Sequence, residues 1–181
     1  ISENGICWRT EETPAIVEKF KTAGIDALFL PFCDFGEEQA AAQIAASFHL
    51  PVLIWGARDE RPNTDVSRGR DTQCGMFAAT KVLRRHGVKY SYIYNCETES
   101  DAFAQGYDRF IRTAAVLKAL RNLRLAKIGD RPVPFMSVMT NEADLIRRMG
   151  VTVIPISPAE VSRRAKEIME KKTEDFLSYY N

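Results

Sequence analysis

Three segments of the sequence combine charged or aromatic side chains with a position directly after a short apolar run. They are residues 32–36 (FCDFG), 56–71 (GARDERPNTDVSRGRD) and 130–136 (DRPVPFM). Short apolar runs bounded in this way are typical of buried strands, and ligands of open parallel sheets bind beyond the carboxyl ends of the strands. We therefore expect binding or chemistry at these three segments.

The segment 56–71 has the densest set of charged side chains. Cations and carboxylates are interspersed along it: Arg58, Asp59, Glu60, Arg61, Asp65, Arg68, Arg70 and Asp71. Guanidinium groups donate pairs of hydrogen bonds and carboxylates accept them, so this mixture suits recognition of a polyhydroxyl compound or a salt-bridge network at a protein interface. A solvent-exposed loop without a ligand explains the same composition, and the residues alone leave these interpretations open.

Cys74 is a candidate nucleophile, because it follows Arg70 near the predicted start of a helix, where the pKa of a thiol is lowered. A nucleophile elbow would place the cysteine directly after a strand, whereas a long loop precedes Cys74. His49 and His86 lie at predicted helix C-termini, where a histidine commonly completes the helix end. We therefore expect Cys74 to be a buried structural thiol. The four cysteines form no CxxC pair and indicate reduced thiols.

Composition excludes several classes of protein and points to a soluble, cytoplasmic one. The 25 Lys and Arg residues balance 24 Asp and Glu residues, and the resulting formal net charge of +1 argues against nucleic acid as a partner. No apolar run approaches the roughly 18 residues of a membrane span, so no membrane partner is expected. The phosphate-binding patterns GxGxxG and GxxxxGK are both missing from the sequence.

A repeated order of helix, glycine and β-branched strand must position the three segments. Strands are expected at residues 26–31, 52–55, 90–95, 123–128 and 152–156. Helices are predicted over 13–23, 37–48, 71–85, 100–122, 141–149 and from 157 onward, the last one beginning with the capping box SPAE. Strands that alternate with helices predict a layered α/β fold with a parallel sheet, and we expect these strands to be buried on both faces.

This order of elements predicts two units. Residues 1–122 contain enough elements for one α/β domain, whereas residues 123–181 contain two strands and two helices, which are too few for an independent sheet. We expect the second unit to be the truncated beginning of another α/β domain. The start at Ile1 and the aromatic residues within 176–180, on a predicted helix, agree with a fragment of a longer protein.

Several stretches of the chain resemble the L-fucose isomerase-like family, the superfamily of L-fucose and L-arabinose isomerases. Residues 30–43 (LPFCDFGEEQAAAQ), 51–60 (PVLIWGARDE) and 70–81 (RDTQCGMFAATK) are similar to its N-terminal region. Residues 119–129 (ALRNLRLAKIG) through 149–156 (MGVTVIPI) resemble the junction into its second domain. The resemblance implies an N-terminal fragment with a Rossmann-like or flavodoxin-like parallel sheet and flanking helices, plus the first part of a second α/β unit.

The resemblance also implies an activity for the longer parent protein, namely aldose–ketose isomerisation through an ene-diol with a divalent metal, usually Mn²⁺. In the family, two carboxylates and a histidine bind the metal and move the proton. These ligands lie late in the second domain and in the third, and none of them matches a residue of this chain. We therefore expect the chain to contain no catalytic or metal-binding residue, to bind no metal tightly and to be inactive alone.

The resemblance further implies a homo-oligomer in which the first domain helps to close the sugar site of a neighbouring subunit. Substrate contacts are accordingly expected at Phe32, Cys33, Asp34, Phe135 and Met136. The charged side chains after the second strand add Arg58, Asp59 and Glu60 to these candidates. Phe32 is the expected aromatic contact, and its replacement by alanine in the full-length protein is expected to raise KM for the sugar.

Two alternatives remain beside the fragment of a sugar isomerase. One is a stand-alone sugar-binding or regulatory α/β module without catalysis. The other is an enzyme that transfers acyl groups through Cys74, for which a thiol that reacts between pH 6 and 8 is required.

Overall fold

The computed structural model describes residues 5–62 and 64–171, which form two compact units, Ile1–Val116 and Leu117–Asn181. In chain order, the elements of the first unit are η1 (Thr10–Glu12), α1 (Thr13–Ala23), β1 (Leu28–Phe32), α2 (Glu38–Ala46), β2 (Val52–Gly56), α3 (Thr72–Arg85), β3 (Ser91–Ile93) and α4 (Asp101–Leu120). The last four residues of α4 belong to the second unit. The second unit continues with β4 (Arg124–Ile128), η2 (Met136–Val138), α5 (Glu142–Met149), β5 (Thr152–Ile156) and α6 (Pro158–Lys171).

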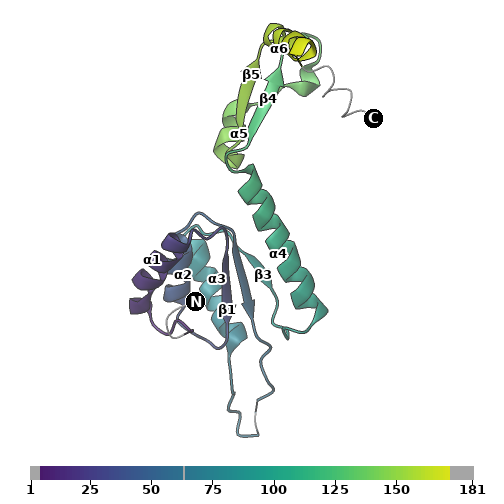
Figure 1. Ribbon diagram of the computed structural model, residues 1–181. Coiled ribbons are helices and arrows are strands. Elements are labelled where there is room, and N and C mark those ends of the chain that lie inside the picture. The colour runs from purple at the N-terminus through teal and green to yellow at the C-terminus, as the bar shows by residue number, and fades with distance from the viewer. Residues whose placement is uncertain (1–4, 63, 172–181) are drawn as a thin grey trace. The chain divides into compact units, whose positions relative to one another are not determined.

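The first unit is built around a parallel three-stranded sheet with the order β1-β2-β3. Leu28 of β1 lies opposite Val52 of β2, and Leu53 lies opposite Ser91 of β3. Helices α1, α2 and α3 cover one face of the sheet and α4 covers the other (Figure 1). Because all three strands run the same way, their carboxyl ends and the loops that follow them meet at one edge.

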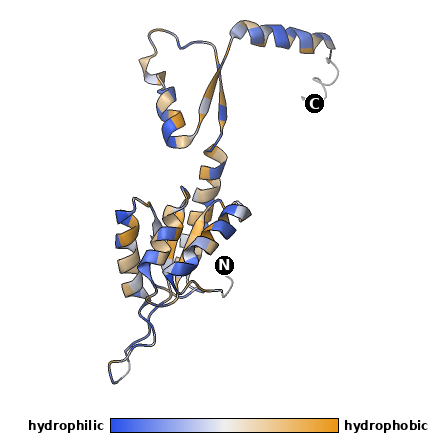
Figure 2. Cartoon of the chain, turned by 90° about the vertical axis from the view of Figure 1, so that its left-hand side faces the viewer, coloured by the Kyte–Doolittle hydropathy of each residue, from blue (hydrophilic) through white to orange (hydrophobic). Residues whose placement is uncertain are grey.

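Apolar side chains fill both faces of this sheet, and Figure 2 shows the hydrophobic strands enclosed by helices. The face toward α1, α2 and α3 buries strand residues Leu28, Phe32, Val52 and Ile54 against helix residues Ile16, Val17, Ile44, Met76, Ala79 and Leu83. The other face buries Leu53, Trp55 and Ile93 beneath α4, where Phe103 packs edge-to-face on Trp55 with ring centroids 5.0 Å apart. Each face of the sheet therefore has its own core.

Local signals in the sequence account for where the helices begin and end. Pro14 occupies the first turn of α1, where its fixed φ suits a helix start, and Gly24 ends α1 with a φ of 60°. Gly106 lets α4 approach the sheet closely, because a Cβ at this position would lie 2.6 Å from Ile93 Cγ1. The predicted strands and helices are all present, with ends that differ from the prediction by up to two residues within the described ranges.

The second unit contains a separate parallel pair, β4 and β5, in which Arg124 lies opposite Thr152 and Ile128 opposite Ile156. Asn141 caps α5 by accepting a hydrogen bond from Asp144 N at 3.1 Å, and Gly150 ends this helix with a φ of 72°. All five residues of β4 are exposed. The two-stranded sheet thus exposes residues that a third strand or a covering helix would bury in a larger sheet.

The predicted fold class is confirmed, because the protein is α/β with parallel sheets flanked by helices. The expectation that the strands are buried on both faces is correct for β2, but it is wrong for the other four strands, each of which exposes at least one residue to solvent. The physical reason is that, among the strands of the described residues, only β2 has a strand on either side. The aromatic residues within 176–180, which were expected on a helix, lie outside the described residues.

Candidate functional site

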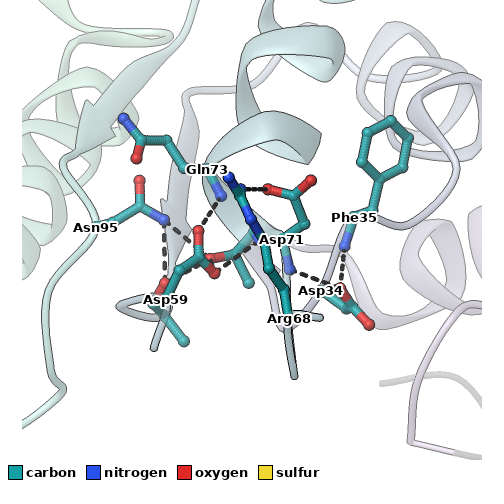
Figure 3. A network of polar contacts seen from close by, with 9 residues as sticks. Asp34, Phe35, Asp59, Arg68, Asp71, Gln73 and Asn95 are labelled. Atoms are coloured by element: carbon teal, nitrogen blue, oxygen red, sulfur yellow. Dashed lines mark hydrogen bonds and ion pairs between the residues drawn. The ribbon is translucent and has the colours of Figure 1, made fainter. Parts of the chain in front are cut away.

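The candidate site in the first unit lies where the loops after β1, β2 and β3 meet the N-terminus of α3. The segment between β2 and α3 extends beyond the carboxyl ends of the strands (Figure 1). The loop after β1 supplies Asp34, the loop after β2 supplies Asp59, and Asn95 follows β3. Hydrogen bonds connect all three residues to the first residues of α3 or to Asp71 directly before it (Figure 3).

Asp59 caps α3 although it lies 13 residues before Thr72 in the chain. Its Oδ1 accepts hydrogen bonds from Thr72 N at 2.8 Å and Thr72 Oγ1 at 2.5 Å, and its Oδ2 accepts one from Gln73 N at 2.9 Å. These two N–H groups belong to the first turn of α3, where a helix has no internal acceptor for them and favours negative charge. Asp59 therefore anchors the loop after β2 to the start of α3.

Burial of the Asp59 carboxylate would by itself raise its pKa, but four interactions outweigh that effect and lower the pKa below its usual value. They are the hydrogen bond from the Thr72 hydroxyl, those from the backbone N–H groups of Gln73 and Thr72, and the positive charge of Arg70. The group is therefore ionised at neutral pH and acts as an acceptor, not as a proton donor.

Thr72 and Asn95 complete this network, although the sequence analysis did not single them out. The Thr72 side chain is fully buried, and its hydroxyl contacts Ala57 O at 2.5 Å as well as Asp59. Asn95 Nδ2 donates to Ala57 O and to Thr72 Oγ1, both at 3.0 Å. The position of Asn95 at the carboxyl end of a predicted strand was the signal that could have identified it, because it falls at the same sheet edge as Asp34 and Asp59.

Asp34 ties the loop after β1 to the same helix end. Its Oδ1 accepts hydrogen bonds from Phe35 N at 2.7 Å and from Asp71 N at 3.0 Å. Gly75 permits the close packing of this loop on α3, because a Cβ at Gly75 would overlap with the backbone oxygen of Phe35. The loops after β1 and β2 are thus both held by α3.

Four of the charged residues around the loop after β2 form two exposed pairs. Arg70 lies 3.1 Å from Glu60 and also donates to Arg58 O at 3.3 Å, and Arg68 lies 3.3 Å from Asp71. Among the described residues, none forms a hydrogen bond or ion pair with the exposed Arg58 guanidinium. The backbone of Arg58 is therefore held, while its side chain remains available.

The structure separates the two phenylalanines of the loop after β1. Phe32 is 7% exposed and belongs to the core, whereas Phe35 is 44% exposed. Cys33 is exposed, and Cys33 and Asp34 line a cavity of about 490 Å³ that also contacts Trp8 and Phe20. Phe32→Ala would therefore create a cavity in the core, and Phe35 is the aromatic side chain of this loop that reaches solvent.

Phe135 and Met136 belong to the second unit, in the segment after β4. They are 57% and 63% exposed. Arg131 organises this segment, because its Nη1 donates to Val133 O at 2.7 Å and to Pro132 O at 3.0 Å and lies 3.8 Å from Met136 Sδ. The segment presents two apolar side chains next to a fixed turn.

The structure corrects the expectation for Cys74, which is exposed and not buried. Cys74 is the third residue of α3, and this face of the helix start lies outside the core. His86 is the C-cap of the same helix, 12 residues further on, which corresponds to roughly 18 Å along a helix axis. The structure therefore does not bring Cys74 and His86 together as a nucleophile and base.

The described part of the chain has neither a metal-binding cluster nor a membrane-spanning helix. It contains no group of three or more His, Cys, Asp or Glu side chains that could hold a metal ion. Within the same residues, no helix is both long enough and apolar enough to cross a membrane.

Comparison with known proteins identifies the family. The family described as fucose/sulfoquinovose isomerase, N-terminal domain, matches residues 1–121. The chain belongs to this family. The resemblance to the N-terminal region of L-fucose isomerase-like proteins is thereby confirmed, and the match includes the loops that carry Asp34, Asp59 and Asn95.

Similar curated proteins carry the name sulfoquinovose isomerase. Those of Priestia aryabhattai and Priestia megaterium (strain ATCC 12872 / QMB1551) are each 24% identical over 172 residues, which cover 95% of this chain and 38% of the relative. That of Clostridium sp. (strain MSTE9) is 27% identical over 143 residues, which cover 78% of this chain and 31% of the relative. The chain therefore spans less than two fifths of the length of these relatives.

Proposed function

We propose that this chain is the N-terminal part of a sugar isomerase that interconverts an aldose and a ketose. In that enzyme the chain contributes contacts between subunits and part of the sugar site of a neighbouring subunit. The observation that carries the proposal is the family match over residues 1–121, supported by relatives named sulfoquinovose isomerase. The stand-alone binding module and the Cys74 enzyme have no comparable support.

The reaction requires groups that the described residues do not supply. Isomerisation moves a proton between the two carbons that exchange the carbonyl, which needs a positioned base, and a divalent ion such as Mn²⁺ would stabilise the charge that develops on the sugar oxygens. The donor set does not fit such an ion, because no suitable cluster occurs among the described residues and Oδ1 of both Asp34 and Asp59 accepts backbone N–H groups. We assign the Mn²⁺ ligands and the base to the rest of the enzyme.

The predicted contact residues divide into two groups with different roles. Asp34 and Asp59 hold the loops on α3, so their contribution to a sugar site is to fix the shape of those loops. Arg58 has an exposed guanidinium on a fixed backbone, and Cys33 is also exposed, so these two side chains can contact a sugar. Phe135 and Met136 of the second unit offer apolar contacts of the kind that sugar C–H groups make.

The test is to express the full reading frame and the 181-residue chain separately and to assay both with sulfoquinovose and with L-fucose in the presence of Mn²⁺. We expect the full-length protein to convert at least one of these sugars into its ketose, and the shorter chain to convert neither. Ketose formation is measured by NMR of the anomeric and ketose carbons. A full-length protein that isomerises no sugar, or a 181-residue chain that isomerises one unaided, would contradict the proposal.

The role of Arg58 is tested in the full-length enzyme by Arg58→Ala, with Arg61→Ala as the matched control in the same exposed loop. Loss of a charged hydrogen bond to the sugar is expected to raise KM about tenfold for Arg58→Ala, with kcat changed much less. Arg61→Ala is expected to leave both constants near their original values. Equal effects of the two substitutions would remove Arg58 from the site.

A further inference from the structure

The first strand of the sheet has an open edge. In the order β1-β2-β3, β1 has β2 on one side, and the described residues place no strand on the other. Leu28 N donates to Pro51 O at 2.9 Å and Phe32 O accepts from Ala57 N at 3.2 Å, so the backbone groups of Leu28 and Phe32 face β2. Backbone groups of alternate residues face opposite sides of a strand. The N–H and C=O of Phe29 and the C=O of Pro31 therefore point to the open edge.

An apolar cavity runs along this edge. Its volume is about 490 Å³, and its lining includes all five residues of β1. Because side chains of neighbouring strand residues lie on opposite faces of a sheet, a cavity in contact with five consecutive residues passes along the edge of the strand, not over one face. Phe20 of α1 and Ala41 of α2 line it as well, so apolar side chains accompany the free backbone groups.

We propose that this groove binds an extended strand, which joins β1 as a fourth strand and belongs to a part of the longer isomerase polypeptide outside residues 1–181. The proposal rests on the chain being part of a longer isomerase. An extended segment is the occupant that fits, because it offers the unpaired N–H and C=O groups that Phe29 and Pro31 require, whereas the interior of a helix has already paired its own.

The occupant is assigned to the same polypeptide because more than half the length of each relative lies outside the matched region. A strand of that polypeptide is present at a high effective concentration, so it needs less intrinsic affinity than a separate partner. Pro31 also argues against indiscriminate pairing. Pro31 has no N–H group, so Phe29 and Pro31 together offer one donor and two acceptors to an added strand. The remaining binding free energy of that strand must come from apolar contacts in the groove.

The experiment is residue-resolved hydrogen exchange on the 181-residue chain and on the protein from the full reading frame. We expect the Phe29 amide to exchange about 100-fold more slowly in the full-length protein, because it gains a main-chain acceptor. The Leu28 amide is the internal control, since it donates to Pro51 in both proteins and should be protected in both. Hydrogen exchange does not depend on activity, so a full-length protein that isomerises no sugar would leave this test intact.

Two variants on α2 test whether the exchange protection of the Phe29 amide depends on the groove. Ala41 lines the cavity, whereas Ala46 is exposed on the same helix and does not line it. In the full-length protein, Ala41→Glu places a charge in the apolar groove and is expected to remove most of the protection at Phe29, whereas Ala46→Glu is expected to preserve it. Retained protection of the Leu28 amide shows that the sheet of each variant remains folded.

Three outcomes would overturn the proposal. The first is a Phe29 amide that exchanges equally fast in the two proteins, and the second is a reading frame that encodes nothing beyond residues 1–181. The third is a 181-residue chain that dimerises in sedimentation experiments and protects Phe29 as its concentration rises, because a second copy would then occupy the edge.

Discussion

Strands β2 and β4 have the same length and the same parallel pairing, yet their surroundings are opposite. All five residues of β2 are buried and all five residues of β4 are exposed. β2 lies between two strands, with α3 on one face and α4 on the other, whereas β4 has β5 as its one neighbour in the two-stranded sheet of the described residues. The comparison teaches that an apolar run specifies a strand, while its neighbours determine whether the strand is buried.

The caps of α3 and α5 differ in how far along the chain the capping residue lies from the helix. The acceptor at the start of α3 is Asp59, which lies 13 residues before Thr72, so this cap also joins a loop to a helix. The acceptor at the start of α5 is Asn141, three residues before Asp144. The first unit thus uses a capping group to fix its tertiary structure, and the second unit uses one for local helix stability.

The largest expected difference between the units is the cost of removing a leucine side chain from each sheet. Leu53 of β2 is 1% exposed and Leu125 of β4 is 49% exposed. We expect Leu53→Ala to lower the free energy of unfolding of the first unit by about 3 kcal/mol, because it removes buried contacts and leaves a cavity. Leu125→Ala is expected to cost less than about 1 kcal/mol.

Urea unfolding can separate these effects, because Trp8 and Trp55 both lie in the first unit. Tryptophan fluorescence therefore follows that unit, while far-UV circular dichroism follows both. Losses of similar size for the two substitutions in the 181-residue chain would break the comparison. If the loss for Leu125→Ala grew in the full-length protein, this would mean that the rest of the polypeptide covers β4.

The sequence was informative where a structure is specified by neighbouring residues. Pro14 and Gly24 mark the start and end of α1, and Asn141 and Gly150 do the same for α5, because caps and helix stops act over one turn. Burial was not predictable in this way. Leu125 and Val153 lie opposite each other and are both apolar, as residues of a buried strand pair are. Their burial requires a helix or another sheet packed over them, and the local sequence does not encode that layer.

The candidate site shows the same limit. The sequence identified Asp34, Asp59 and Arg58 as polar residues at strand ends, but the roles of the two aspartates depend on hydrogen bonds to residues 13 to 37 positions away. The choice between Phe32 and Phe35 as the exposed aromatic residue also needed the structure. Phe32 is the last residue of β1, and its side chain is buried in the core. Successive side chains of a strand point to opposite faces, so an error of one residue in the alignment of the strand changes which side chain is expected to be exposed.

The next largest effect is expected from removal of the two caps. Asp59→Ala leaves the N–H groups of Thr72 and Gln73 without their acceptor and releases the loop after β2, and we expect it to cost about 2 kcal/mol. Asn141→Ala removes one local hydrogen bond and is expected to cost about 1 kcal/mol. Unfolding in urea measures both values, and an Asp59→Ala variant as stable as Asn141→Ala would contradict a tertiary role for Asp59.

The pH dependence of the Asp59 contribution follows from the direction of its shift. The pKa of Asp59 is lower in the folded protein than in the unfolded chain. Its stabilising effect is therefore fully present above the ordinary carboxyl pKa of about 4 and is lost as the pH falls through the lowered value. The stability difference between the original chain and Asp59→Ala should accordingly shrink below about pH 4.

The smallest expected effect concerns Glu160 in the second unit. Its contribution to stability should depend on salt concentration more strongly than that of Asp59. Hydrogen bonds from Arg163 and Arg164, at 2.7 and 2.6 Å, lower the pKa of Glu160 to about 2. Its stabilisation of α6 is therefore present above the ordinary glutamate pKa and is lost as the pH falls toward 2. Glu160 pairs with exposed side chains, whereas Asp59 accepts hydrogen bonds from backbone N–H groups and a buried hydroxyl.

Salt at about 1 M screens charges beyond roughly 3 Å, so it should weaken the exposed pairs of Glu160 far more than the cap at Asp59. We expect Glu160→Gln to reduce helical circular dichroism slightly at low salt and about pH 7, with no reduction at high salt and a reduction that shrinks as the pH falls through about 2. The destabilisation by Asp59→Ala at neutral pH should persist at high salt. Equal salt sensitivity of the two variants would mean that Asp59 stabilises the protein through its interaction with the charge of Arg70. Asp59 would then act as a surface ion pair, as Glu160 does, and not as a tertiary anchor of the first unit.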